Sequence, residues 1–307
     1  MSSSSSKREI RNEFGWSFSR DRLFNRCPRA FYWHYYGSWG GWLDDAPASA
    51  KTARRLKKLD RLTMIVGKVV HEVIARALRT RPGLPSNVPI QRLHHEVESA
   101  FDRVLTEGEL FESYYGIPIP DGLVAGERMR THALIEAFAS HGYARRLFTV
   151  PKERILVADE NNFDHKKVPH EIGVLWGNPD VLVYGDDGTP HLIDWKTGAA
   201  SRDDELQLAV YALFASLKFG VDPLKAVGHT IYLSDGDVHT THISANAMAD
   251  AESRIAWFGA AVTGRLTNVS ENEAADIERF PMTENQHLCV TCNFRELCNR
   301  SAEAVPF

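Results

Sequence analysis

The sequence has no long apolar run, no excess of positive charge and only four cysteines. None of its apolar stretches approaches the roughly 20 residues that a membrane helix requires, so we expect no membrane span. The net charge of −4 excludes a global basic field, so any binding to nucleic acid must come from a local patch and bound metal. The serine-rich segment 1–12 lacks an apolar signal core, which predicts a disordered tail and a cytoplasmic protein.

The composition is that of an ordinary globular protein. The chain has 307 residues, of which 43% are hydrophobic and 25% are charged. This length is sufficient for one large domain or two small ones. Nothing indicates secretion, and the cysteine spacing does not match a small disulfide-stapled scaffold.

Residues 177–196 carry two short apolar segments around a Gly-Asp-Asp-Gly-Thr-Pro turn, a pattern typical of an antiparallel hairpin. Asp180 precedes the first strand, while Asp194 and Lys196 end the second, so folding brings their side chains to one edge. Because side chains alternate along a strand, Asp194 and Lys196 point to one face and Trp195 to the other.

Two carboxylates beside an ammonium group suit metal-dependent hydrolysis. Carboxylates that lie a few ångströms apart repel each other, and a hard divalent cation such as Mg²⁺ relieves this repulsion. The cation lowers the pKa of a bound water, and a nearby lysine orients that water or offsets developing charge. The alternative is a surface hairpin whose Asp and Lys side chains are only solvated.

The pair Pro179-Asp180 followed by Asp194-Trp195-Lys196 resembles the signature of the PD-(D/E)XK nuclease superfamily. The resemblance implies an α/β, restriction-endonuclease-like core with a central mixed sheet flanked by helices. It also implies that Mg²⁺ or Mn²⁺ is the cofactor.

Further motifs are similar to those of the RecB-like branch of that superfamily. Gln207 and Tyr211 match its Gln-x-x-x-Tyr motif, and Gly67 with His71 matches its first motif. Alternatively, His71 is a hydrogen-bonded histidine of the core, and Tyr211 is the one residue with a polar end on an apolar helix face. Glu171 is a weaker candidate for an additional carboxylate. The resemblance implies the following roles: metal ligation by His71, Asp180, Asp194 and the Trp195 carbonyl, and catalysis by Asp180, Asp194, Lys196, Gln207 and Tyr211.

Cys289, Cys292 and Cys298 form a Cys-x₂-Cys-x₅-Cys run, and Cys27 stands far upstream before Pro28. Four thiolates suit either zinc or a [4Fe–4S] cluster. The arrangement resembles the iron–sulfur staple of AddB-type and CRISPR-associated exonucleases, which implies a [4Fe–4S] cluster that pins the C-terminal segment to the N-terminal helix. Structural zinc, which usually uses paired Cys-x₂-Cys knuckles, and free thiols are the alternatives.

Six of the eleven residues in 51–61 are basic. As a single helix, this segment would place Arg54, Lys58 and Arg61 on one stripe, where they could contact DNA phosphates. The alternative is a solvated charged face.

Periodicity and turn signals predict the remaining organisation. We expect one nuclease domain over 13–307, made of an N-terminal segment 13–60, a helical insertion 82–147, a catalytic α/β core 148–264 and a C-terminal cysteine cap 265–307. Within it, helices are expected at 17–27, from Pro28, and at 61–79, 89–107, 122–147, 203–219 and 246–264. Strands are expected at 152–159, 168–176, 226–234 and 237–243.

The resemblance therefore implies a Mg²⁺- or Mn²⁺-dependent deoxyribonuclease that acts as an exonuclease. Its substrate would be single-stranded DNA or duplex ends, with protein partners in a repair or defence complex. Two other classes remain open: a catalytically silent nucleic-acid-binding subunit and a zinc-binding regulatory protein. Intact Asp180, Asp194 and Lys196 argue against the silent subunit, because a degenerate site should have lost at least one of them.

Overall fold

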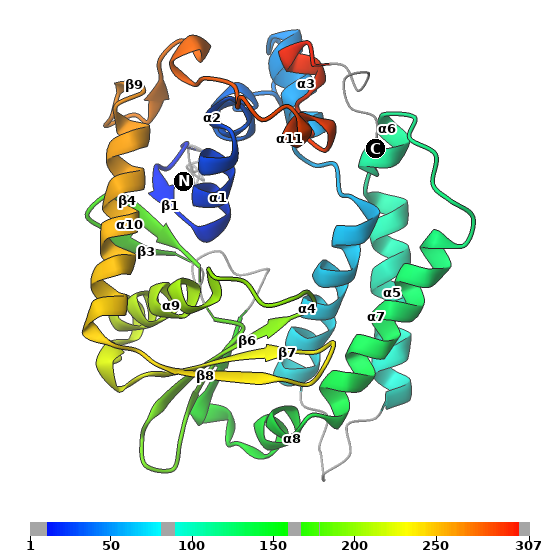
Figure 1. Ribbon diagram of the computed structural model, residues 1–307, viewed down its shortest axis with the longest axis vertical. Helices are drawn as coiled ribbons and strands as arrows, with labels where there is room; N and C mark the ends of the chain where they lie inside the picture. The colour runs from blue at the N-terminus through cyan, green and yellow to red at the C-terminus, as the bar shows by residue number, and fades with distance from the viewer. Residues whose placement is uncertain (1–10, 81–89, 159–166, 178, 301–307) are drawn as a thin grey trace, which may run out of the picture. The chain divides into compact units, whose positions relative to one another are not determined.

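The computed structural model describes residues 11–80, 90–158, 167–177 and 179–300 (Figure 1). The first ten residues of the predicted tail lie outside this range. The chain divides into two compact units. The terminal unit comprises Met1–Lys57, His170–Leu175 and Ala256–Phe307, and the central unit comprises Lys58–Pro169 and Trp176–Ile255.

A five-stranded mixed sheet forms the framework of the central unit. Its strand order is β2-β5-β6-β7-β8. The strands are β2 (Ile155–Val157), β5 (Val181–Tyr184), β6 (Pro190–Lys196), β7 (Val227–Tyr232) and β8 (Val238–His242). Only β6 and β7 are parallel, and the other neighbours are antiparallel. The predicted hairpin is confirmed, since β5 and β6 pair in register from Val181–Ile193 to Tyr184–Pro190.

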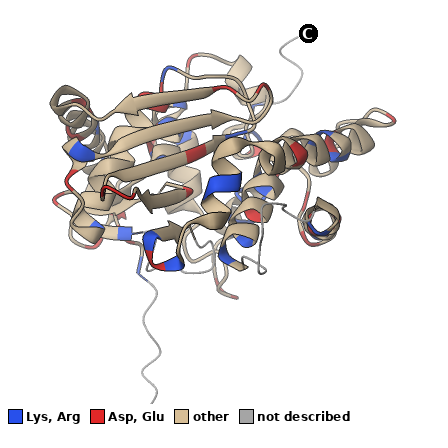
Figure 2. Cartoon of the chain, turned by 90° about the horizontal axis from the view of Figure 1, so that it is seen from below, with Lys and Arg blue, Asp and Glu red and all other residues tan. Residues whose placement is uncertain are grey.

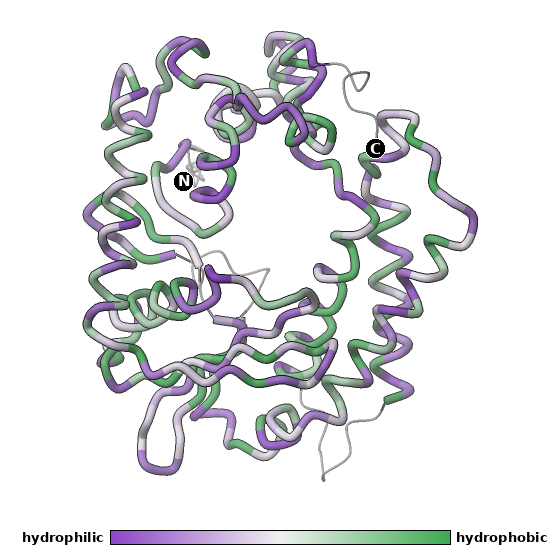
Figure 3. Tube along the Cα trace, in the orientation of Figure 1, coloured by the Kyte–Doolittle hydropathy of each residue, from purple (hydrophilic) through white to green (hydrophobic). Residues whose placement is uncertain are grey.

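Alternation along β6 divides its side chains between the two faces of the sheet. Ile193 and Trp195 belong to the apolar core that the sheet shares with three long helices. These helices are α4 (Leu62–Thr80), α5 (Ile90–Glu107) and α7 (Leu123–Ser140). Green, apolar residues run through α4 in Figure 3. The predicted insertion therefore contributes α5 and α7 to the main core of this unit, rather than forming a separate layer.

Helix α9 (Asp204–Phe219) packs against β6 and β7. A Cβ added at Gly228 of β7 would lie 2.7 Å from the Leu208 side chain, so glycine permits this close approach of helix and strand. Asp194 and Lys196 both form hydrogen bonds with residues of α9. Trp195 packs on the opposite side against Phe138, and their ring centroids are 5.0 Å apart. The hairpin thus separates the polar side chains from the core, as alternation predicts.

Two predicted elements are interrupted. The helix expected at 122–147 breaks at His141, which is extended (φ −68°, ψ 137°) and caps the next helix by accepting from the Tyr143 amide. The strand expected at 168–176 is two strands, because the chain turns at 171–172 before Gly173, whose φ of +125° suits glycine. The remaining elements of this part of the chain are α6 (Phe111–Tyr114), α8 (Gly142–Thr149), β3 (Lys167–His170), β4 (Gly173–Trp176) and the 3₁₀ turns Lys152–Arg154 and Pro223–Lys225.

The terminal unit begins with the predicted capped helix. Ser17 accepts a hydrogen bond from the Arg20 amide at 3.1 Å, which caps α1 (Phe18–Arg26). Pro28 then begins the next helix, as expected. The other elements of this unit are β1 (Gly15–Trp16), α2 (Pro28–Tyr32), a π-helix at Trp33–Gly37, α3 (Ala48–Leu56), β9 (Leu266–Asn268), β10 (Glu273–Ala274), α11 (His287–Val290) and the 3₁₀ turns Ile277–Arg279 and Glu296–Cys298.

An aromatic cluster joins distant parts of the sequence within the terminal unit. Phe24, Phe31 and Phe258 contact one another, with ring centroids 5.3 to 5.8 Å apart. Phe258 lies on α10 (Ala245–Thr263), a helix whose residues are divided between the two units. Strand β1 pairs with β4 in parallel, an association of segments far apart in sequence that local patterns do not predict.

The predicted α/β class, with a mixed sheet flanked by helices, is confirmed. Among the helices that the structure describes, none combines the length and apolar character that a membrane span needs.

Candidate active site

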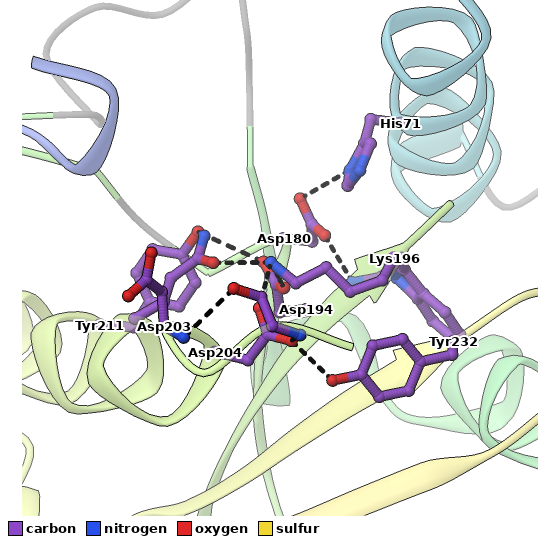
Figure 4. A network of polar contacts seen from close by, with 11 residues as sticks. His71, Asp180, Asp194, Lys196, Asp203, Asp204, Tyr211 and Tyr232 are labelled. Carbon is purple, nitrogen blue, oxygen red and sulfur yellow. Dashed lines mark hydrogen bonds and ion pairs between the residues drawn. The ribbon is translucent and has the colours of Figure 1, made fainter. Parts of the chain in front are cut away.

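The hairpin brings Asp180 to a helix-borne histidine (Figure 4). Asp180 Oδ1 lies 3.1 Å from Nδ1 of His71, which projects from α4. The other oxygen of Asp180, Oδ2, accepts a hydrogen bond from the Trp195 amide at 2.8 Å. The Asp180 carboxylate raises the pKa of His71 to about 9, so at neutral pH the pair is an imidazolium and a carboxylate.

Asp194 is buried and faces Lys196. The Lys196 Nζ lies 2.7 Å from Asp194 Oδ2, and the carboxylate is 4% exposed. Burial and the neighbouring Asp180 together raise the pKa of Asp194 to about 6, even though Lys196 opposes the shift. Negative charge is therefore concentrated at this edge of the sheet, and the side chains already present do not fully compensate it.

Helix α9 supplies the next polar contacts. Gln207 Oε1 accepts from Lys196 Nζ at 2.6 Å, and Gln207 Nε2 donates to the Tyr211 hydroxyl at 2.5 Å. That hydroxyl donates to Asp194 Oδ1 at 3.3 Å. Residues 207 and 211 are one helical turn apart, so both reach the same strand. The structure thus brings together all five predicted catalytic side chains and His71.

Two members of the network were not predicted. Asp204 accepts from the Tyr232 hydroxyl at 2.6 Å, and its other oxygen lies 3.5 Å from Lys196 Nζ. Figure 4 shows Asp204 beneath Lys196, with Tyr232 reaching it from the adjacent strand. In the sequence, Asp204 indicates only a favourable charge at a helix N-terminus. Its spacing of three residues from Gln207, which places both on one helix face, is the signal that could have identified it.

The chemistry of the donor set fits a hard divalent cation. Two carboxylates and an imidazole are ligands that Mg²⁺ or Mn²⁺ accepts, and the raised pKa of Asp194 indicates negative charge that such an ion would relieve. Throughout the described residues, no three His, Cys, Asp or Glu side chains form a ready-made metal-ligand group. In this structure Asp180 pairs with His71, and Asp194 pairs with Lys196.

All four cysteines lie in the terminal unit and are free thiols. Burial raises the pKa of Cys292 to about 11, and Cys27 and Cys298 add to this shift. Burial, Cys27 and Cys289 likewise raise the pKa of Cys298. The fold therefore brings the upstream cysteine into electrostatic range of the C-terminal run, although the thiols do not form a metal-ligand group as they stand.

Hydrogen bonds outside the thiols hold the cysteine-bearing segments together. Arg26 Nη2, at the end of α1, donates to the Leu288 carbonyl at 3.0 Å and to Thr291 Oγ1 at 2.9 Å. Arg29 Nε donates to the Phe280 carbonyl at 2.7 Å. The predicted packing of the C-terminal cysteine segment on the N-terminal helix is therefore confirmed.

The predicted basic stripe does not form on one helix. Helix α3 ends at Leu56, so it carries Arg54 but neither Lys58 nor Arg61. The chain leaves the helix because Leu59 is buried and the Asp60 backbone forms hydrogen bonds with the backbones of Glu109 and Phe111. The Arg54 guanidinium instead lies over the Trp42 ring, 5.0 Å from its centroid. Figure 2 shows Lys and Arg interspersed with Asp and Glu along the helices.

Glu171 also differs from its expected position. It lies in the exposed turn between β3 and β4 and not within a strand. It belongs to the terminal unit, whereas Asp180 and Asp194 belong to the central unit.

The sequence matches the family model of the PD-(D/E)XK nuclease superfamily over residues 15–299. This match spans both compact units and includes every side chain of the site. A search of curated proteins finds no match.

Proposed function

Because the chain belongs to the PD-(D/E)XK nuclease superfamily, we propose that it is a metal-dependent nuclease that hydrolyses phosphodiester bonds in DNA at the Asp180, Asp194 and Lys196 site. The observation that carries this proposal is the convergence of two acidic side chains, from opposite arms of one hairpin, with Lys196 and His71. A solvated surface hairpin has no need of a carboxylate that is 4% exposed.

Asp180 and Asp194 would hold Mg²⁺ or Mn²⁺, with His71 and the Trp195 carbonyl as further ligands. The ion, when bound, supplies an acidified water and stabilises charge on a phosphoryl oxygen. It would replace the positive partners that Asp180 and Asp194 have now. His71 must then lose the proton that its pairing with Asp180 retains.

Lys196 is the group that remains to act on the water and the phosphate. Its ammonium contacts Asp194, Gln207 and Asp204, and these contacts restrict where Nζ can lie. Gln207 and Asp204 of α9 contact the ammonium independently of Asp194, so Lys196 would still be placed to orient the attacking water if Asp194 held a metal. Gln207 and Tyr211 position Lys196 and Asp194 and present polar atoms to the DNA strand.

We propose that Cys27, Cys289, Cys292 and Cys298 bind a [4Fe–4S] cluster with a structural role, and that zinc is the alternative ion. The rise in the pKa values of Cys292 and Cys298, to which Cys27 contributes in both cases, supports this assignment because it brings the upstream thiol close to the C-terminal run. A cluster there would link residues at the two ends of the sequence, which stabilises the fold by closing a long loop. The thiols belong to the terminal unit, and the proposed role of the cluster is to hold structure and not to take part in cleavage.

We propose DNA ends as substrates and exonuclease activity as the mode, with partners in repair or defence. A cleavage assay tests the proposal. Wild-type protein with Mg²⁺ or Mn²⁺ should degrade end-labelled DNA, and Asp194→Ala and Lys196→Ala should not. The assay is repeated on single- and double-stranded DNA whose 5′ or 3′ end is blocked. An exonuclease is stopped by a block at the end where it starts, whereas an endonuclease is not. Equal activity in the wild type and both variants would refute the site, and no activity in any of them would favour a silent DNA-binding subunit.

A further inference from the structure

The terminal unit contains a cavity of about 440 Å³ that the nuclease site does not use. This volume lies within the range of small-ligand sites, about 300–1,000 Å³. Three aromatic residues line it, and they follow one another at helical spacing: Tyr32, Tyr36 and Trp39. Two carboxylates on the β9–β10 hairpin, Glu271 and Glu273, complete its polar side.

The walls of the cavity are fixed by hydrogen bonds and packing. The Tyr36 hydroxyl donates to Asn272 Oδ1 at 2.9 Å, and Asn272 Nδ2 donates to the Asn12 carbonyl at 3.0 Å. Asn272 is buried and has a φ of +50°, a conformation that asparagine tolerates better than most residues. The buried Phe280 ring supports Tyr32 and Tyr36, at centroid distances of 5.2 and 5.8 Å. The cavity is therefore formed before any ligand arrives, which reduces the ordering cost of binding.

The charges of the lining favour a cation. The charged residues are Glu271, Glu273 and Arg11, so the carboxylates outnumber the guanidinium by one. Both glutamates are exposed and reachable by a ligand. Aromatic faces carry negative electrostatic potential and attract cations within about 6 Å. A nucleotide would bring a phosphate close to two carboxylates, which opposes its binding.

The same unit already uses contacts between arginine and aromatic rings. The Arg20 guanidinium lies 4.5 Å from the Tyr35 ring centroid, and that of Arg54 lies 5.0 Å from the Trp42 centroid. Guanidinium groups stack on rings and bind carboxylates through a planar fork, a combination that a lysine ammonium does not offer. Aromatic rings and carboxylates occur together in this cavity.

We propose that this cavity binds the side chain of an arginine presented by a basic segment of a partner protein. The guanidinium would stack on Trp39 or Tyr36 and donate hydrogen bonds to Glu271 and Glu273. The proposal does not rest on nuclease activity, because none of these residues belongs to the Asp194 site.

The test uses full-length protein and a fluorescent peptide with one arginine flanked by glycine and serine. Its matched partner has citrulline, which keeps the shape but not the charge. Fluorescence anisotropy should show binding of the arginine peptide and at least about tenfold weaker binding of the citrulline peptide. The double variant Glu271→Gln, Glu273→Gln and the single variant Trp39→Ala should each weaken arginine binding by a similar factor.

Glu284→Gln, another exposed glutamate of the terminal unit, is the charge-matched control and should bind as the wild type does. Unchanged circular dichroism in the variants would show that lost binding is not lost folding. Equal affinity for arginine and citrulline, or no binding of either, would overturn the proposal. So would competition by dGMP or oligothymidylate stronger than that of the unlabelled peptide, which would identify the cavity as a nucleotide site.

Discussion

The Lys196 ammonium lies 2.7 Å from Asp194 Oδ2 and, in the same position, donates a hydrogen bond to Gln207 Oε1 at 2.6 Å. One side chain thus connects the strand that carries the acidic group with the helix that follows it. The ammonium forms an ion pair with Asp194 and offsets part of its charge. Gln207 and Asp204 of α9 also contact the ammonium. Lys196 would therefore stay in the site if Asp194 bound a metal.

Replacing Lys196→Met separates these two roles. We expect DNA cleavage to fall by about 100-fold or more, because the group that orients water and offsets developing charge is lost. Mn²⁺ binding should persist or strengthen, since the ammonium no longer competes for Asp194. Cleavage rates and calorimetric Mn²⁺ titrations measure both effects. Lys225→Met, at a lysine whose side chain is 77% exposed, is the control that should change neither.

Asp194→Asn should abolish cleavage yet stabilise the metal-free protein. The pKa of Asp194 is about 6 and lies above its ordinary value, so ionisation of this carboxyl destabilises the fold as the pH rises from about 4 to 6 and above. Removing the charge should raise the free energy of unfolding at pH 7.5 by about 1–3 kcal/mol. Urea denaturation in the presence of a chelator measures it. Asp250→Asn, on the exposed side of α10, should leave stability unchanged, and a destabilised Asp194→Asn would contradict the proposed repulsion.

Much of this site could be predicted because its determinants are local. Asp180, Asp194 and Lys196 sit at the ends of two strands joined by a recognisable turn, and hairpin register then brings them together. Gln207 and Tyr211 were identified through their resemblance to a family motif, and their helical spacing then places both on one face. His71, by contrast, reaches the hairpin through tertiary packing of α4 and was identified through family resemblance.

The features that were missed or misplaced depend on contacts between distant segments. Tyr232 reaches Asp204 across neighbouring elements, and no local pattern marks that bond. Helix α3 ends early because Leu59 is buried and Asp60 pairs with Leu110. Arg54 therefore lies on the helix, whereas Lys58 and Arg61 lie beyond its end. Strand β1 is only two residues long and exists through its pairing with β4.

Metal affinity should depend on pH through His71. The pKa of His71 is raised to about 9 by Asp180, and a metal ligand must be the neutral imidazole. Apparent Mn²⁺ affinity should therefore rise by up to about tenfold per pH unit below 9 and level off above it. The stability of the metal-free protein should change in the opposite direction. The stabilisation from the His71–Asp180 ion pair is complete below pH 6.5 and is lost as the pH rises through 9. Calorimetric titration at several pH values checks the affinity. His71→Asn should flatten this profile, and an unchanged profile would exclude His71 as the titrating group.

Tyr232→Phe tests the unpredicted part of the network. It removes a 2.6 Å hydrogen bond to the buried Asp204 and leaves the packing of the ring. We expect a loss of about 1–2 kcal/mol in unfolding free energy. Cleavage should fall less than in Lys196→Met, because the lost bond acts on Lys196 only through Asp204 and leaves the ammonium in place. Tyr184→Phe, at the turn end of β5, is a matched control on the same sheet. A Tyr232→Phe variant as inactive as Lys196→Met would assign Tyr232 a direct role.

The cysteine assignment predicts a coloured protein. Anaerobically purified wild type should be brown, with broad absorbance near about 400 nm and about four iron atoms per chain. Cys27→Ser should lower the iron content and the melting temperature together. Colourless protein containing zinc would select the zinc alternative, and protein with neither metal would contradict a tetrathiolate site.

The central claim is that the hairpin carboxylates and His71 share one divalent cation. The most direct measurement is a crystal structure of the protein with Mn²⁺, with the ion located by its anomalous scattering. We predict a peak within about 2.3 Å of oxygen atoms of both Asp180 and Asp194, with His71 turned from its ion pair toward the metal. A peak elsewhere, or unbroken Asp180–His71 and Asp194–Lys196 pairs at saturating Mn²⁺, would contradict it.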